Sequence, residues 1–129
     1  MARLCCLAAV DPKDVPLLVG ALKGAGESGH AVVAGLDVAA LARLAPDLLV
    51  ADIDGLKVDA LEALRQVRFV LPECVIVIYT AAVKISWSRA CHLAGANCML
   101  SKESHESELT NGLRRALKTG CFTDPHFAA

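Results

Sequence analysis

Five short apolar runs, each followed by a segment of helical periodicity, restrict the fold of this chain more than any other feature. Their apolar side chains stand on consecutive positions, so a strand built from any of them would be apolar on both faces. Such strands are typical of parallel sheets that helices cover on both sides. The runs span 3–10, 30–35, 47–52, 74–80 and 97–101.

The segments between and after the runs predict five helices. Apolar residues recur there at intervals of three and four positions, which is the spacing of one helix face. The segments are 15–22, 37–44, 61–71, 87–94 and 109–117. We interpret Asp11, which precedes Pro12, as a candidate cap of the first helix. Because right-handed crossovers link parallel strands, the pattern predicts an α/β fold with a doubly wound, five-stranded parallel sheet of the flavodoxin type.

Length and charge exclude several classes of function. A chain of 129 residues is expected to form one domain. We place this domain at 1–120 and interpret 121–129 as a C-terminal tail or the start of a linker. The net charge of −1, from 13 basic and 14 acidic residues, gives no electrostatic footprint for nucleic acid or an anionic membrane. We therefore expect no direct nucleic-acid binding by this chain and no membrane association.

The six cysteines do not form a disulfide or zinc pattern. Cys5 and Cys6 are adjacent, the others are scattered, and the sequence contains no CxxC motif. Several lie inside apolar runs, where a free cysteine behaves as a small hydrophobic residue. These features predict free thiols and a reducing, cytoplasmic location.

The stretch "GAGESG" at 24–29 matches the GxGxxG pattern of dinucleotide-binding proteins. That fingerprint must follow a strand and open a helix, so that the phosphates meet the helix N-terminus. Here the glycines end a predicted helix and precede a predicted strand. We therefore interpret them as a helix stop.

Polar residues follow four of the five predicted strands. Asp11, Asp52, Thr80 and Lys102 each stand at the carboxyl end of an apolar run. Ligands of open α/β sheets bind at these ends. Each residue alone is commonplace, but their spacing as a set predicts one shared crevice.

These residues resemble the motifs of bacterial response-regulator receiver domains over nearly the whole chain. In "PDLLVADIDGLKVDALEALRQVR", Asp52 falls on the family's phosphoacceptor and Asp59 on the acid of its downstream "DG". "VIVIYTA" places Thr80 on the switch hydroxyl, and "HLAGANCMLSK" places Lys102 on the family's lysine. The end, "ALKTGCFTDPHFAA", resembles the last helix and linker entry of LuxR/NarL-type regulators.

The resemblance implies a signalling mechanism. Asp52 would accept a phosphoryl group from a histidine kinase, and Mg²⁺ would neutralise the developing charge. Lys102 would pair with the phosphoryl oxygens, and Thr80 would hydrogen-bond to them. The response would shift the face formed by the fourth helix, the fifth strand and the fifth helix. The residues show no nucleophile–base pair and no metal cluster, so we do not expect an enzyme.

The departures from the family pattern concern the metal site above all. Receiver domains carry a pair of acids after the first strand, and the corresponding residues here are Ala9 and Val10. Only Asp11, one position further on, is acidic. Because Mg²⁺ requires hard oxygen ligands, we expect poor Mg²⁺ binding and impaired phosphorylation. Asp54 would either supply a substitute metal oxygen or repel a phosphoryl group on Asp52.

Three further departures are smaller. The family's switch aromatic falls on Met99, and its "MPG" tripeptide reads Gly55-Leu56-Lys57. The interval between the second and third strands is short, which predicts a truncated second helix.

The sequence thus predicts an atypical receiver domain of a bacterial response regulator. It would control output, expected to be transcription, through contacts with a signalling protein or a second copy of itself. The homodimer would use the face of the fourth helix, fifth strand and fifth helix, or the first and fifth helices. One alternative is a working phosphoacceptor at Asp52, with Asp11 or Asp54 replacing the missing acid. Another is a small-molecule binder, since this fold hosts many functions.

Overall fold

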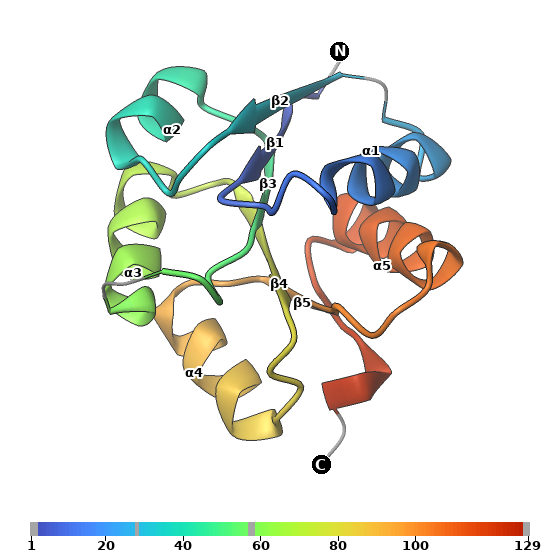
Figure 1. Ribbon diagram of the computed structural model, residues 1–129. Coiled ribbons are helices and arrows are strands. Elements are labelled where there is room, and N and C mark those ends of the chain that lie inside the picture. Colours follow the sequence, from blue (N-terminus) through green and yellow to red (C-terminus); the bar gives the residue numbers. More distant parts are fainter. Residues whose placement is uncertain (1–2, 28, 57–58, 128–129) are drawn as a thin grey trace.

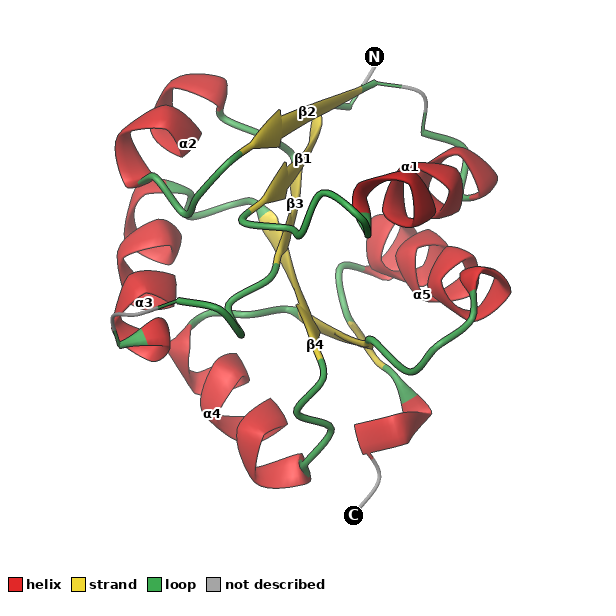
Figure 2. Ribbon diagram, viewed as in Figure 1, coloured by secondary structure: helices red, strands yellow, loops and turns green. Residues whose placement is uncertain are grey.

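The computed structural model describes residues 3–27, 29–56 and 59–127. A parallel sheet lies between two layers of helices (Figures 1 and 2). Its strands are β1 (Cys5–Ala8), β2 (His30–Val33), β3 (Leu48–Ala51), β4 (Val75–Thr80), β5 (Cys98–Ser101) and β6 (Phe122–Thr123), in the order β2-β1-β3-β4-β5-β6. The helices are α1 (Val15–Gly24), α2 (Val38–Leu44), α3 (Ala60–Val70), α4 (Ile85–Ala94) and α5 (Glu106–Thr119). None of these described helices has the length and apolar composition of a membrane span.

The sheet is buried on both faces, as its continuous apolar strands predict. Every residue of β1, β3 and β5 is buried. Successive side chains of a strand point to opposite faces, so Cys5 and Leu7 join one core cluster while Cys6 and Ala8 join the other. Helices α1 and α5 cover the first cluster, and α2, α3 and α4 cover the second (Figure 1). The predicted parallel α/β fold is therefore confirmed.

The sheet has six strands, where the sequence predicts five. β6 is two residues long and pairs in parallel with β5 at the sheet edge. Neither Phe122 nor Thr123 belongs to an apolar run, so only pairing with β5 makes them a strand. The 3₁₀ turn that follows, η1 (Pro125–Phe127), leaves Phe127 fully buried. Residues 122–127 of the expected tail thus pack against the domain.

The first helix begins later than a cap at Asp11 would place it. α1 starts at Val15, with Asp14 at its N-cap and Pro16 in its first turn. Asp11 forms a separate turn, because its carboxylate accepts the Lys13 N–H at 3.0 Å and its carbonyl accepts the Asp14 N–H at 2.8 Å. The interpretation of Asp11 as the helix cap was wrong. This turn keeps Asp11 in the loop at the carboxyl end of β1.

The glycines at 24–29 end a helix, as their order in the sequence predicts. α1 finishes at Gly24, and Gly26 has a φ of 97°, a left-handed conformation that glycine adopts without strain. β2 begins directly afterwards, at His30. The glycine stretch therefore precedes a strand and does not open a helix onto a phosphate.

Two aspartates cap helices with their side chains. Asp37 accepts the Ala40 N–H at 3.1 Å, and it starts an α2 of only seven residues. Asp59 accepts the backbone N–H groups of Leu61 and Glu62 at 3.0 and 3.2 Å. The truncated second helix is thus confirmed, and the acid of the "DG" motif is the N-cap of α3.

All six cysteines lie within the described residues and are free thiols. Burial raises the pKa of Cys74, Cys91 and Cys98 to about 12, so these thiols stay protonated at neutral pH. They act as small core residues, as their place in apolar segments predicts.

Arg68 joins three segments at the amino end of the sheet. Its Nε and Nη2 atoms donate to the Gly95 carbonyl at 3.0 and 2.7 Å, at the end of α4. Its Nη1 atom donates to the carbonyls of Leu71 and Cys74 at 2.8 and 2.9 Å. Nη2 also donates to Asn97 Oδ1 at 2.6 Å. No sequence pattern marks this arginine, because its acceptors become neighbours only in the folded chain.

We expect Arg68→Met to lower the free energy of unfolding by about 2–4 kcal/mol, because several partly buried acceptors lose a charged donor. Arg65→Met is the matched control on the same helix. Among the described residues, Arg65 pairs only with the exposed Glu62, at 3.2 Å, and its loss should cost no more than about 1 kcal/mol. Urea unfolding of both variants measures the difference, and equal losses would contradict the role given to Arg68.

Candidate functional site

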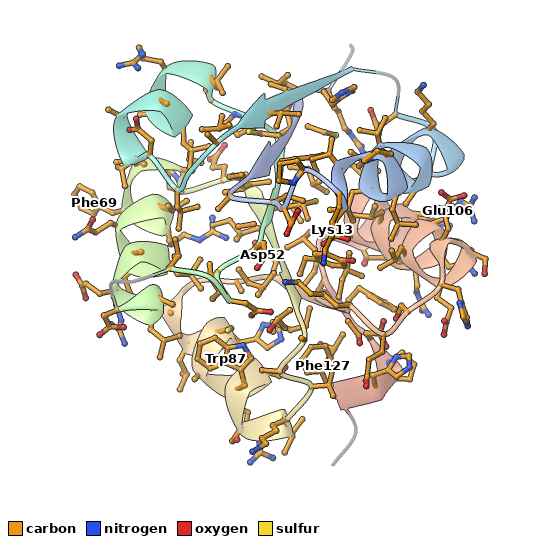
Figure 3. The ribbon with its side chains drawn as sticks, in the orientation of Figure 1. Lys13, Asp52, Phe69, Trp87, Glu106 and Phe127 are labelled. Atoms are coloured by element: carbon orange, nitrogen blue, oxygen red, sulfur yellow. The ribbon has the colours of Figure 1, made fainter. Side chains whose placement is uncertain are left out.

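A charged cleft opens at the carboxyl ends of the strands and has a volume of about 670 Å³. The loops after β1 and β3 form most of its wall, and Lys102 closes it beyond β5. Asp52 and Lys13 lie at the same end of the sheet (Figure 3). Four carboxylates and two ammonium groups line the cleft, which gives the lining a net charge of −2; they are Asp11, Asp14, Asp52, Asp54, Lys13 and Lys102.

Asp52 lies directly after β3 and is only 6% exposed. Its backbone N–H donates to the Ala8 carbonyl at 3.1 Å, which extends the pairing of β1 and β3 by one step. Its Oδ2 atom is 2.7 Å from Lys102 Nζ, and its Oδ1 atom accepts the Asp54 N–H at 3.0 Å. The strand thus ends on a carboxylate because a lysine and a backbone donor compensate the charge that burial would otherwise destabilise.

Asp54 is the most heavily hydrogen-bonded side chain in the cleft. Its Oδ1 atom accepts the Thr80 hydroxyl at 2.5 Å, and its Oδ2 atom accepts the Ala81 N–H at 2.8 Å. Lys102 Nζ lies 3.1 Å from Oδ2. Burial opposes ionisation, but these donors and the lysine charge outweigh it and hold the pKa of Asp54 below its usual value. Asp54 is therefore ionised at neutral pH.

Thr80 ends β4, is fully buried and points its hydroxyl toward Asp54. The same hydroxyl oxygen accepts the Ala82 N–H at 3.0 Å. One carboxylate and one hydroxyl therefore hold two successive amides of the loop that leads into α4. In this arrangement the Thr80 hydroxyl is already donating, and its single proton is committed to Asp54.

Lys102 bridges Asp52 and Asp54, and its ammonium also lies 5.6 Å from the centre of the Tyr79 ring. Its backbone N–H donates to the Thr80 carbonyl at 2.9 Å, which continues the pairing of β4 with β5. Burial opposes the ammonium charge, yet the hydrogen bonds and negative charges of the two aspartates raise the pKa of Lys102. The lysine is a fixed positive charge shared by two carboxylates.

The end of β1 does not supply a pair of metal ligands. Ala9 and Val10 line the cleft with a methyl and an isopropyl group, and Asp11 is the nearest acid in the chain. Among the described residues, no group of three or more His, Cys, Asp or Glu side chains is arranged to hold a metal. Both carboxylate oxygens of Asp54 already accept hydrogen bonds, from the Thr80 hydroxyl and from the Ala81 N–H. As arranged, the side chains do not fit an octahedral Mg²⁺ site.

The structure thus brings together Asp52, Asp54, Thr80 and Lys102, and it leaves Asp11 at the rim of the same cleft. Lys13 and the Ala81 amide also belong to the site, although neither was predicted from the sequence. Lys13 follows the first predicted strand, so the rule that marked Asp11 also applies to it. The Ala81 amide carries no signal in a sequence. Lys57, in the tripeptide that replaces "MPG", lies outside the described residues.

A second hollow, of about 620 Å³, lies on the other side of Asp54. Trp87 of α4 lines it together with Ala81 and Ala82. The ring packs against the core beneath α4 and is partly buried (Figure 3). Its indole N–H is buried and has no hydrogen-bond partner among the described residues. As the only tryptophan of the chain, it is a reporter for the loop that Asp54 holds.

Comparisons of the sequence with protein-family models and with curated proteins gave no match. Solved structures of response-regulator receiver domains share the fold, and three of them serve as examples. One is the REC domain of RcsB from Salmonella enterica serovar Typhimurium, in the presence of phosphomimetic BeF3⁻, with a TM-score of 0.79 and 16% sequence identity. The match covers 99% of this chain and 97% of the RcsB domain. A LuxR-family response regulator from Aurantimonas sp. SI85-9A1 has a TM-score of 0.78 and 22% sequence identity, and the match covers 99% of this chain and 94% of the regulator chain. The Vibrio cholerae chemotaxis protein CheY4 has a TM-score of 0.73 and 18% sequence identity, and the match covers 89% of this chain and 98% of the CheY4 chain. The chain therefore has the fold of response-regulator receiver domains, as its motifs predict.

Proposed function

We propose that this chain is an atypical receiver domain of a bacterial response regulator whose output does not depend on efficient phosphorylation of Asp52. The observation that carries the proposal is the position of Asp54. Its carboxylate accepts hydrogen bonds from Thr80 and Ala81 and pairs with Lys102. The resemblance assigns the hydroxyl and the ammonium to a phosphoryl group on Asp52, so one internal anion already holds both.

Charge makes the arrival of a phosphoryl group unfavourable. A phosphorylated side chain carries about −1.5 to −2 charges at neutral pH. Asp54 is ionised in the same cleft and would repel it. Lys102, the cation that the described part of the chain places between the two aspartates, is already shared by them. Ala9 and Val10 bring no oxygen for a metal ion that would neutralise the excess, so the phosphorylated state lacks both its donors and its counter-charge.

The output would then run through protein contacts in cytoplasmic signal transduction. Asp54 and Thr80 together fix the first residues of the loop between β4 and α4. The position of α4 would follow from this internal carboxylate. We propose another signalling protein, or a second copy of this chain, as the partner, with transcription as the process controlled. The net charge of −1 supports no direct contact with nucleic acid.

A working phosphoacceptor is the second candidate, and the geometry of Asp52 favours it. The carboxylate faces the cleft, and Lys102 lies 2.7 Å away to pair with a transferred phosphoryl group. Asp11 lines the same cleft. In that case a histidine kinase would be the partner, and Asp54 would have to leave Thr80 during each phosphorylation cycle.

We expect no stable phosphorylation when the protein is incubated with Mg²⁺ and acetyl phosphate, because the donors are occupied and the acid pair is missing. Intact-mass spectrometry measures the gain of one phosphoryl group. A stoichiometric gain that disappears in Asp52→Ala would establish the second candidate instead.

The same experiment on a variant that carries the family's acid pair tests whether Asp54 and the missing acids are what limits phosphorylation. Ala9→Asp, Val10→Asp and Asp54→Ala together return the acid pair and free the donors. Ala9 has a φ of 59°, a conformation that aspartate tolerates better than most residues. We expect this variant to gain a phosphoryl group at Asp52. A folded variant that gains none would show that Asp54 and the missing acids are not what limits phosphorylation.

We expect Asp54→Asn to loosen the loop after β4. The amide keeps the shape of the side chain but loses the charge that strengthens its hydrogen bonds, an effect of about 1–2 kcal/mol. Protection of the Ala81 amide from hydrogen exchange should fall by roughly tenfold, and the fluorescence of Trp87 should change. Asp14→Asn, at the rim of the same cleft, is the control. Unchanged exchange in Asp54→Asn would contradict the role of Asp54.

A further inference from the structure

The last six described residues, 122–127, run alongside strand β5, and we call them the strap. Its backbone adds to the sheet, with Phe122 opposite Cys98 and Thr123 opposite Met99. The Asp124 N–H donates to the Met99 carbonyl at 3.0 Å and extends this pairing by one residue. The strap thus occupies the main-chain groups that an edge strand would otherwise present to another segment.

Side chains of the strap contact both helices beside β5. Phe122 packs so closely on α5 that a Cβ atom at Gly112 would lie 2.8 Å from its ring. The Thr123 hydroxyl lies 3.4 Å from Nε2 of His92 on α4. The strap therefore spans the face formed by α4, β5 and α5, which the family resemblance predicts to be the output surface and one of two candidate dimer surfaces.

Phe127 fills an apolar notch at the end of the strap. Its ring is fully buried in the core cluster that contains Met99 of β5 and Cys91 of α4. Figure 3 shows it reaching from the tail toward α4. Position 99 itself brings no aromatic ring to this edge. Residues of the sheet and of α4 line the notch, and the ring that fills it, Phe127, comes from the strap.

A small polar cluster fastens the strap to the loop after β5. The Ser104 hydroxyl donates to Asp124 Oδ2 at 2.5 Å, and His126 Nδ1 lies 2.6 Å from Asp124 Oδ1. Ser104 is also 3.3 Å from the same His126 nitrogen. Because serine and aspartate share one ring nitrogen, the histidine cannot relay a proton between them as in a hydrolase triad. The cluster is a latch, and Ser104 stands two residues after Lys102.

The strap is built to open more readily than the rest of the sheet. Its strand, β6, is only two residues long and pairs with one neighbour, β5. Gly120, with a φ of 77°, and the exposed Cys121 separate it from α5. When it leaves, β5 becomes an unpaired edge beside an empty apolar notch. An extended peptide can bind such an edge by adding a strand.

We propose that the edge of β5, with the notch beside it, is a docking surface for extended peptide segments, and that the strap is its resident occupant. In the isolated chain the strap closes the α4–β5–α5 face. A segment from a partner binds there only by displacing it. The proposal is independent of the phosphorylation of Asp52, and its test uses neither Mg²⁺ nor a phosphodonor.

The test measures binding of a labelled peptide, FTDPHF, to the full chain by fluorescence anisotropy. Phe127→Ala empties the notch, and Phe69→Ala removes an equal ring that is 87% exposed on α3. We expect the peptide to bind Phe127→Ala at least tenfold more tightly than either the wild type or Phe69→Ala. A peptide with its last phenylalanine replaced by alanine should lose this binding. Equal binding to all three proteins, or none to a folded Phe127→Ala, would overturn the proposal.

Ser104→Ala provides a second test that does not remove core volume. The variant keeps Phe127 in place and removes one hydroxyl of the latch. We expect the Asp124 amide to exchange several times faster than in the wild type, while amides of β4 keep their rates. Asp124 and β4 amides that exchange together in both proteins would mean that the strap opens only when the whole domain unfolds, and would refute the proposal.

The latch also predicts that the strap is held more tightly in mild acid than in base. The hydrogen bond to Asp124 raises the pKa of His126 above its usual value, burial opposes this, and the negative charges of Asp124, Glu108 and Glu103 add to the rise. A histidine with a raised pKa stabilises the folded state while protonated, so its contribution is complete below about 6.5 and is lost as the pH rises through the folded pKa.

Burial opposes ionisation of Asp124, but Ser104 and His126 outweigh it and lower its pKa, so Asp124 stays charged throughout this window. Besides Glu103 and Glu108, His92 of α4 also faces the strap, with Nε2 3.4 Å from the Thr123 hydroxyl. Protection of the Asp124 amide, corrected for intrinsic exchange, should fall several-fold between pH 6 and pH 8.5. In His126→Gln it should be flat, with His30→Gln as the control, and an equal fall in His126→Gln would contradict the latch.

Discussion

The burial of one parallel sheet on both faces is the constraint on which the rest of this protein depends. Because no face of β1, β3 or β5 meets water, polar side chains can appear only where these strands end. Parallel strands end at the same edge, so the polar residues of separate segments meet there without any contact between those segments in the sequence. The cleft with Asp52, Thr80 and Lys102 is a direct consequence of how the core is built.

Within that cleft the decisive quantity is the balance of charge. Lys102 holds two carboxylates, and each gains an ammonium partner while it shares that partner with the other. Asp54 also takes the Thr80 hydroxyl and the Ala81 amide. The cleft is therefore nearly satisfied as it stands, and the loop before α4 is already fixed. A reaction that adds negative charge to the cleft must first break these contacts. For this reason the proposed function has an output that does not depend on efficient phosphorylation of Asp52.

The cleft and the strap lie at opposite ends of one short turn. Lys102 ends the site, and Ser104, two residues later, fastens Asp124 of the strap. The Ser104 N–H donates to the Ser101 carbonyl at 3.1 Å, and the Glu103 N–H donates to the Ser101 hydroxyl at 2.9 Å, so the turn is itself held. Lys102 and the strap are therefore connected through the hydrogen bonds of this turn. This contiguity gives the α4–β5–α5 face a physical link to the cleft.

The sequence by itself determined the first five strands, the five helices and several polar residues of the cleft, because burial, periodicity and the carboxyl-end rule are local signals. It identified Asp52, Thr80 and Lys102, and it left two roles open for Asp54. Only the tertiary structure decided that Asp54 turns to Thr80 and the Ala81 amide, since a side-chain direction depends on donors from another strand. The same holds for Arg68, β6 and Phe127. Their partners lie elsewhere in the chain, and no pattern in the neighbouring residues predicts those contacts.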